Sequence, residues 1–310
     1  MTTELNGIEP RHEFRLDTPR CRRLVCAPMR RHARMLIAPG WESLLRQHGL
    51  DNLESVYRCH QGEVIKRTGS VEVRSLPLGS SPGARTVFIK KYWAANPSQL
   101  WSGMFRGVLF GRSKARREYE NLNRLRAWKL DAPAAVAFGE ERRAGWLLRS
   151  FLISESVTDP LPLHVFIRDR MPATDSGHPH RLRRELIEQL AAFTRRLHEH
   201  AFVHHDYFWR NILLSGGDLK RFFLIDAHKG RRWFPWEERR ARAKDLAALD
   251  APAPQFFRRT ERLRFFLIYR GRGALAREDK ALLRLTLRMA APQRERQLHR
   301  VRGIGRSTHG

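Results

Sequence analysis

The sequence predicts an α+β protein of two lobes, in which a small antiparallel sheet with one main helix precedes a mainly helical lobe. Short alternating runs between residues 63 and 90 indicate the sheet. A stretch without Gly or Pro, residues 114–128, indicates the main helix. Residues 181–200 repeat Leu or Phe at helical spacing and indicate a long amphipathic helix in the second lobe.

Changes of composition divide the chain into four segments. We expect a basic extension over residues 1–40, a first lobe over 41–156, a second lobe over 157–297 and a frayed basic tail over 298–310. A connector rich in Pro and short polar residues, 155–162, marks the boundary between the lobes. For the Arg-rich start of the chain, a loosely ordered tail and a surface-binding arm both remain open.

Local patterns place the elements within the lobes. Residues 63–65 and 71–73 form a predicted hairpin with Gly69 at its tip, and residues 86–90 form a third strand that ends in Lys90. The other expected elements are a strand at 146–154, helices at 41–50, 242–249, 258–270 and 278–290, and loops at 76–84 and 168–180.

The chain is strongly basic. Its 310 residues hold 59 Lys plus Arg against 32 Asp plus Glu, which gives a net charge of +27. This balance favours an anionic partner, whether nucleic acid, an anionic membrane surface or a phosphorylated substrate. The apolar fraction of 42% allows a sizeable core.

Cysteine usage and hydropathy indicate a reducing, cytoplasmic setting. Cys21, Cys26 and Cys59 make an odd and sparse set, so neither a disulfide framework nor a zinc site is expected. Residues 1–10 lack the apolar core of a signal peptide, and no stretch approaches the ~18 apolar residues of a membrane span. We therefore expect any membrane association to be peripheral.

Two Asp residues and one Asn form the most informative pattern. Asp206 and Asn211 lie in a polar loop that leads into an apolar run, and a second apolar run ends on Asp226. The predicted loop, strand, turn and strand bring these three side chains to one cleft. Phosphoryl transfer from a metal-bound nucleotide requires such a set: one carboxylate for the acceptor hydroxyl, with an amide oxygen and a second carboxylate for the metal.

Glu118 lies on an apolar helix face and needs a partner. It shares that face with Leu122 and Leu125, at positions i, i+4 and i+7. Charged groups are seldom placed on an apolar face without a partner. Lys90, at the end of a buried-type strand, is the expected partner of Glu118.

These residues, in this order, resemble the protein-kinase-like fold. Residues 87–90 are similar to the V-A-I-K strand, and residues 204–211 are similar to H-R-D-x-x-x-x-N. Residues 225–227 stand where D-F-G would be, and the resemblance spans about residues 62–250.

Within that fold the chain more closely resembles the bacterial lipopolysaccharide-core sugar kinases, which phosphorylate heptose or Kdo residues. The likeness lies in the lysine strand at residues 89–92, the basic start of the glutamate helix at 116–119, the aromatic-rich loop at 205–209 and the segment 225–229.

The resemblance implies ATP and Mg²⁺ as cofactors. Lys90 would hold the α- and β-phosphates of ATP, Glu118 would orient Lys90, and Gly69 with the backbone around it would cover the phosphates. In the second lobe, Asp206 would align the acceptor hydroxyl and accept its proton. Asn211 and Asp226 would hold Mg²⁺ through hard oxygen ligands.

Departures from the protein-kinase pattern point to a glycan or small-molecule acceptor. Gly69 stands almost alone where a G-x-G-x-x-G loop would be, and no A-P-E follows Asp226. His205 replaces the Arg of H-R-D, so regulation by an activation-loop phosphate is not expected. Ala227 and His228 replace F-G, and a basic aromatic stretch follows instead of a peptide-docking loop.

Several residues near the predicted site have a structural interpretation as well as a functional one. We expect His204 to be structural and to bond the region of Asp226, and Lys91 to be a surface neighbour of Lys90. Asp245 either braces the catalytic loop or is a surface acid of its helix. The histidine cluster of His198, His200 and His205 is more typical of an exposed helix end than of a metal site. The aromatic cluster of Trp233, Phe234 and Trp236 either packs in the core or stacks on a sugar ring.

The leading hypothesis is an ATP- and Mg²⁺-dependent kinase that phosphorylates a sugar of lipopolysaccharide core or a similar lipid-linked glycan. Its basic surface would hold it to the anionic inner face of the cell membrane, at about 1 kcal/mol for each Lys or Arg near that surface. The alternatives are a soluble small-molecule kinase of the aminoglycoside-phosphotransferase type and a non-catalytic, kinase-like basic binding protein. Nucleic acid is not expected as the partner, and the oligomeric state is left open.

Overall fold

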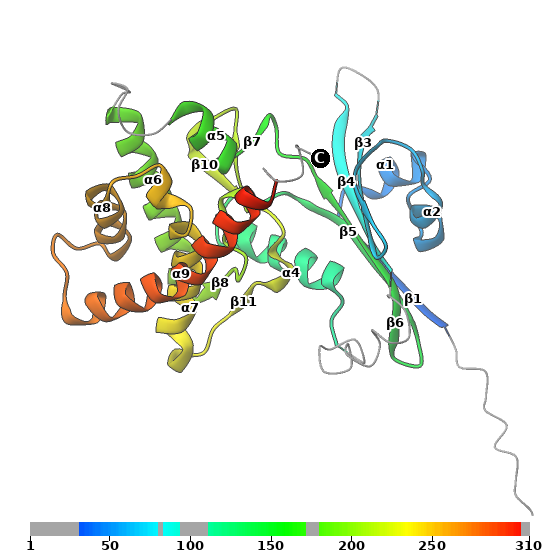
Figure 1. Ribbon diagram of the computed structural model, residues 1–310. Coiled ribbons are helices and arrows are strands. Elements are labelled where there is room, and N and C mark those ends of the chain that lie inside the picture. Colours follow the sequence, from blue (N-terminus) through cyan, green and yellow to red (C-terminus); the bar gives the residue numbers. More distant parts are fainter. Residues whose placement is uncertain (1–30, 80–82, 94–110, 172–179, 305–310) are drawn as a thin grey trace, which may run out of the picture.

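The protein has two lobes, one built on a sheet and one built mainly from helices (Figure 1). The structure is a computed structural model that describes residues 31–79, 83–93, 111–171 and 180–304. The predicted basic extension before residue 31, part of the predicted loop at 168–180 and the last six residues of the predicted tail lie outside the described residues. The α+β class with a sheet-based first lobe is confirmed.

The first lobe holds a six-stranded antiparallel sheet with the strand order β1-β5-β6-β4-β3-β2. Helices cover both of its faces: α1 and α2 lie on the outer side, and α4 lies between the sheet and the second lobe (Figure 1). The bounds are Arg31–Ile37 for β1, Glu63–Thr68 for β2, Val71–Leu78 for β3, Arg85–Trp93 for β4, Ala135–Arg143 for β5, Trp146–Glu155 for β6, Glu42–Gln47 for α1, Leu53–Arg58 for α2 and Lys114–Ala127 for α4.

Strand β5 was not predicted, and the covered sheet explains why. Its first seven residues are all buried, because Ala135 and Phe138 contact the core under α4 while Val136 and Ala137 contact the core under α1 and α2. A strand buried on both faces shows no alternation of polar and apolar residues. Strand β1 was assigned to the basic extension because it is an Arg-rich edge strand, and charged side chains are typical of sheet edges.

The second lobe packs four long helices around a small strand system. Strands β8 and β11 pair with each other, and β7, β9 and β10 form a three-stranded sheet. The bounds of the α-helices are Leu163–Arg170 for α5, His180–Glu199 for α6, Glu238–Asp250 for α7, Arg259–Arg270 for α8 and Arg277–Ile304 for α9. The bounds of the strands are Pro160–Pro162 for β7, Phe202–Val203 for β8, Ile212–Ser215 for β9, Asp218–Leu224 for β10 and Arg231–Arg232 for β11. The bounds of the short 3-10 helices are Trp209–Asn211 for η1, Ala227–Lys229 for η2, Pro235–Glu237 for η3 and Ala253–Gln255 for η4.

Two local predictions in this lobe were wrong. Helix α5 reaches Arg170, where a loop was expected to begin at residue 168. Helix α9 continues through Pro292 to Ile304, beyond residue 290, where the predicted helix ended. Pro usually ends a helix because it removes a hydrogen bond and collides with the preceding turn, and here the helix passes through it.

Candidate active site

Lys90 and Glu118 form a buried ion pair between the sheet and α4. The Lys90 Nζ lies 2.6 Å from Glu118 Oε1, and the Glu118 side chain is 2% exposed. Helix α4 begins at Ser113, whose hydroxyl accepts the N–H of Arg116, and this cap sets where the turns that follow present their side chains. The pairing expected from the apolar helix face is therefore present.

The same lysine also faces Asp226. Its Nζ lies 3.8 Å from Asp226 Oδ1, so one ammonium group lies between two carboxylates. Burial lowers the pKa of Lys90, but the charges of Glu118 and Asp226 outweigh that effect and raise the pKa above its ordinary value. Lys90 therefore remains a cation at neutral pH.

Asp226 is ionised and sits in a left-handed backbone conformation. Its φ is 59° and its ψ is 39°, a region that few residues other than Gly adopt. Burial would raise the pKa of its carboxyl, but the hydrogen bond with His228, at 3.0 Å from Nδ1 to Oδ1, and the charge of Lys90 hold that pKa well below its usual range. The Asp226 carboxylate therefore carries the negative charge that binding a cation requires.

Asn121, one turn after Glu118 on α4, holds the segment that follows Asp226. Its Nδ2 donates to the carbonyl oxygens of Ala227 and Gly230, at 2.7 Å each. Sequence reasoning missed this residue, although its spacing of three from Glu118 places both on one helix face. One helix therefore positions both Lys90 and the Asp226 segment.

The loop at residues 204–211 brings the side chain of Asn211 to the backbone of Asp206. The Asn211 Nδ2 donates to the Asp206 carbonyl at 2.8 Å, and the Ile225 N–H donates to the Asn211 carbonyl at 3.1 Å. Because its amide nitrogen is used in this way, the amide oxygen of Asn211 is the atom suited to a metal ion. The hydrogen bond from the Ile225 N–H to the Asn211 carbonyl places Asn211 next to Asp226.

Lys229 is a further residue that sequence reasoning did not single out. Its Nζ lies 2.6 Å from Asp206 Oδ2, and its own side chain is 53% exposed. The available signal was its position three residues after Asp226, in a segment that doubles back toward the loop. The carboxylate expected to hold the acceptor hydroxyl therefore has a movable cation beside it.

Asp245, on α7, anchors the backbone of the catalytic loop. Its Oδ2 accepts the His204 N–H at 2.7 Å and its Oδ1 accepts the His205 N–H at 3.0 Å. The side chain is fully buried. Of the two alternatives left open, the bracing role agrees with this geometry, and the surface acid does not.

His204 packs beneath the site as a neutral side chain. Its Nε2 donates to the Ile225 carbonyl at 3.1 Å, and the residue is fully buried. Desolvation lowers the pKa of its imidazole, so the ring stays uncharged and serves to connect the catalytic loop with the strand before Asp226. This agrees with the expected structural role.

Gly69 remains apart from the other predicted residues. It lies at the exposed tip of the β2–β3 hairpin, and among the described residues no hydrogen bond or ion pair links it to the other five. A Cβ added at Gly69 would meet nothing within 4 Å. Its proposed contact with phosphates therefore stays a prediction.

A comparison with known proteins identifies the family. A sequence model described as the lipopolysaccharide kinase (Kdo/WaaP) family matches residues 80–269, more than half of the chain. The chain belongs to this family. It is accordingly a lipopolysaccharide kinase, which is a phosphotransferase. The resemblance of the sequence to the lipopolysaccharide-core sugar kinases is confirmed.

Individual relatives agree with this assignment. The chain is 30% identical over 198 residues to the lipopolysaccharide core heptose(I) kinase WaaP of Pseudomonas aeruginosa strain PAO1, a match that covers 59% of this chain and 70% of that protein. It is 29% identical over 210 residues to the protein of the same name from Escherichia coli, covering 65% of this chain and 74% of that protein.

A solved structure supports the fold. The structure described as WaaP in complex with acyl carrier protein aligns with a TM-score of 0.61 and 24% sequence identity, and the alignment covers 84% of this chain and 98% of that chain. At this identity the likeness concerns the fold, which is kinase-like. The chain therefore shares its fold with that solved structure.

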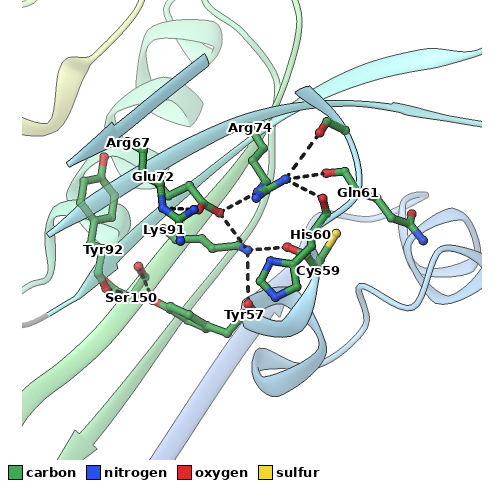
Figure 2. Close-up of polar contacts among 11 residues, drawn as sticks. Tyr57, Cys59, His60, Gln61, Arg67, Glu72, Arg74, Lys91, Tyr92 and Ser150 are labelled. Atoms are coloured by element: carbon green, nitrogen blue, oxygen red, sulfur yellow. Dashed lines mark hydrogen bonds and ion pairs between the residues drawn. The ribbon is translucent and has the colours of Figure 1, made fainter. Parts of the chain in front are cut away.

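Lys91 was expected at the surface, and that prediction was wrong. The residue is 1% exposed and its Nζ donates to the carbonyls of Cys59 at 2.6 Å and Tyr57 at 3.3 Å, as Figure 2 shows. Successive strand residues face opposite sides of a sheet. Lys90 therefore faces α4 and Asp226, whereas Lys91 faces the core under α2.

Lys91 belongs to a buried ionic cluster with Glu72 and Arg74 (Figure 2). Glu72 Oε1 lies 2.7 Å from Arg74 Nε and 3.3 Å from Lys91 Nζ. Burial lowers the pKa of Lys91, and the charge of Glu72 opposes this effect without cancelling it. Burial would raise the pKa of Glu72, but Arg74 and Lys91 outweigh that effect and lower it. The cluster joins α2 and the chain after it to the sheet.

The members of the histidine cluster and of the aromatic cluster differ in their burial. His198 is buried, with Nδ1 at 2.8 Å from the Tyr269 hydroxyl, and His200 stacks on Trp128, so the expectation of an exposed helix end was wrong for His198. Within the described residues, the only group of three possible metal ligands is Glu118, Asp226 and His228. Trp233 packs in the core, whereas Phe234 and Trp236 are exposed.

Replacing Lys91 by Met should destabilise the protein. The change leaves the carbonyls of Tyr57 and Cys59 without their donor in a buried setting, which costs about 1–3 kcal/mol for each group left unpaired. It also leaves Glu72 with Arg74 but without Lys91. We expect a clear fall in the midpoint of urea unfolding for Lys91→Met, and little change for the control Lys66→Met, whose side chain is exposed. Equal midpoints for the two variants would show that the cluster contributes nothing to folding.

Replacing Asp245 by Asn should reduce kcat. The amide can accept only one of the two N–H groups that the carboxylate accepts, so the loop that carries Asp206 loses an anchor. The matched control is Asp250→Asn on the same helix, because Asp250 pairs with Arg262 and Arg294 away from the loop. We expect both variants to lose stability in thermal melts, but only Asp245→Asn to lose kcat by about tenfold or more. A retained kcat would contradict the anchoring role.

Proposed function

We propose that this chain transfers the γ-phosphoryl group of ATP to a sugar hydroxyl of lipopolysaccharide core. The observation that carries the proposal is the buried Lys90–Glu118 pair facing an ionised Asp226, in a chain of the lipopolysaccharide kinase family. Catalysis of this reaction rests mainly on positioning and on neutralising charge. Lys90, Glu118 and Asp226 are proposed to supply both.

Lys90 is the proposed contact for the α- and β-phosphates of ATP. Its charge is secured by two carboxylates, and 18% of its side-chain surface is exposed. Glu118 fixes the direction of the lysine because the two side chains are joined at 2.6 Å. Gly69 and its backbone neighbours are proposed to close over the phosphates when the nucleotide binds.

Asn211 and Asp226 are the proposed ligands of Mg²⁺. One amide oxygen and one ionised carboxylate are hard donors, and Mg²⁺ prefers such ligands together with substrate phosphates and water. Their residues are adjacent through the backbone bond from Ile225 to Asn211, so the donor set fits. The group of Glu118, Asp226 and His228 fits less well, because the Lys90 ammonium already pairs with Glu118. When bound, the ion would neutralise the charge of the transferring phosphoryl group.

Asp206 is the proposed residue for the acceptor hydroxyl. It would accept a hydrogen bond from that hydroxyl, align its oxygen with the phosphorus and take its proton as transfer proceeds. Lys229 would leave Asp206 when the acceptor arrives and place its charge near the incoming phosphate. Its exposed stem allows this movement.

The acceptor is proposed to be a heptose or Kdo residue of the core, with heptose favoured by the two relatives that are named heptose(I) kinases. The net charge of +27 suits an anionic glycan at the inner face of the cell membrane. Within the described part of the chain, no helix has the length and apolarity to cross a bilayer. Peripheral attachment through the basic surface is the proposed mode of membrane contact.

Replacing Asp206 by Asn should abolish phosphoryl transfer. The amide keeps the shape of the side chain but cannot accept the proton, so kcat should fall by about 10²–10⁴-fold. Transfer of radiolabelled phosphate from ATP to purified lipopolysaccharide core measures this. The control is Asp218→Asn, an exposed acid at the start of β10, which should retain full activity. Transfer by Asp206→Asn at the rate of the unaltered protein would defeat the proposal.

Replacing Asp226 by Ala should remove binding of Mg-ATP. A ligand at 100 times its Kd stabilises the folded state by about 2.7 kcal/mol, which raises Tm by several degrees. We expect this rise in the unaltered protein and in Asp206→Asn, which lies on the acceptor side, and its loss in Asp226→Ala or on addition of EDTA. An unchanged rise in Asp226→Ala would contradict the assigned role of Asp226.

A further inference from the structure

Two aromatic side chains after the Asp226 segment are strongly exposed. Phe234 is 56% exposed and Trp236 is 80% exposed, the highest values among the large apolar side chains that the structure describes. Their rings are stacked, with centroids 4.8 Å apart and an interplanar angle of 2°. We call these two residues the aromatic platform. Such exposure of large apolar surface is typical of an interaction site.

The platform is held in place. Glu237 accepts two hydrogen bonds from Arg231, at 2.7 and 2.8 Å, and a third from the Phe234 N–H at 3.1 Å. The Arg231 bonds, with the Phe234 N–H, lower the pKa of Glu237 to about 2, so the carboxylate stays charged. Pro235 restricts the backbone between the two rings. The platform is therefore formed before any ligand arrives.

The platform is also tied to the catalytic loop. Strand β11 pairs with β8, which leads directly into His204, and the Trp233 N–H donates to the Ala201 carbonyl at 2.8 Å. Lys229, which contacts Asp206, lies seven residues before Trp236. Seven residues span at most about 25 Å. A ligand with several sugar rings can therefore reach both Asp206 and the platform, whereas the reacting sugar alone occupies the site at Asp206.

The surroundings of the platform suit a charged glycan. Arg231 and Arg232 before it, and Arg239 and Arg240 after it, are exposed, and Glu238 is exposed among them. One face of a sugar ring carries apolar C–H groups that pack on the electron-rich face of an aromatic ring. Arginine forks pair with carboxylate or phosphate substituents. A helix that lies in the membrane interface presents a whole apolar face, whereas the exposed large apolar side chains of this segment are Phe234 and Trp236, so these residues favour a glycan.

We propose that the aromatic platform binds a sugar ring of the acceptor glycan other than the one that is phosphorylated. This inference rests on the proposed function, because it names the second contact of the same acceptor. Trp236 presents its free ring face to the sugar and Phe234 supports the opposite face. The exposed Arg232, Arg239 and Arg240 hold anionic groups of the glycan, while Arg231 stays paired with Glu237. Binding energy from this remote ring aligns the reacting hydroxyl at Asp206.

The test compares variants on acceptors of two lengths. Steady-state kinetics use deacylated core oligosaccharide, which is water-soluble, and a disaccharide that contains the reacting sugar. We expect Trp236→Ala to raise KM for the oligosaccharide about tenfold, equivalent to about 1.4 kcal/mol, and to leave KM for the disaccharide unchanged. Trp236→Phe should restore most of the affinity, since it retains a ring. The control Leu263→Ala removes a 38%-exposed apolar side chain on α8 and should behave as the unaltered protein.

Three outcomes would overturn the proposal: an unchanged KM of Trp236→Ala for the oligosaccharide, an equal loss on both acceptors, or a loss that appears only with lipid-linked acceptor in anionic vesicles. The last would assign the rings to the bilayer. Calorimetric titration of the oligosaccharide without ATP measures the platform separately from catalysis. Glycan binding that weakens in Trp236→Ala, in a protein that transfers no phosphate, would refute the proposed function and retain the platform.

Discussion

The ion pair between Lys90 and Glu118 is the contact on which the rest of the site depends. Glu118 is almost completely buried, and an unpaired carboxylate in that position would cost several kcal/mol. Helix α4 can therefore dock on the sheet only where Lys90 meets it. Because Asn121 on the same helix holds Ala227 and Gly230, this docking also positions the segment of Asp226.

A second set of contacts maintains strained backbone beside that pair. His205 and Asp226 both have positive φ values, 66° and 59°, which cost of order 1–3 kcal/mol each in residues other than Gly. Asp245 accepts the N–H groups of His204 and His205, and His204 in turn donates to the carbonyl before Asp226. The buried Asp245 of α7 thus holds the backbone at His205, directly before Asp206, and is linked through His204 to the backbone before Asp226.

Sequence patterns predicted site residues whose chemical type and spacing together require a partner. They failed for strand residues in a sheet that is covered by helices on both faces. Glu118 could be paired with Lys90 because an acid on an apolar helix face requires a cation. Lys91 was misplaced because adjacent strand residues were treated as neighbours, although they face opposite sides of the sheet. Strand β5 escaped notice because burial on both faces removes the alternation by which strands are recognised.

By itself, the sequence determined the kinase class, the two-lobed α+β order and the identity of Lys90, Glu118, Asp206, Asn211 and Asp226 as the candidate site, because residue type and local spacing are properties of the chain alone. Only the tertiary structure decided which charges are buried and which are free. It assigned Lys91 to the core, Lys229 to Asp206, and Phe234 with Trp236 to the surface. Burial and long-range pairing arise from elements distant in sequence, so no local pattern can specify them.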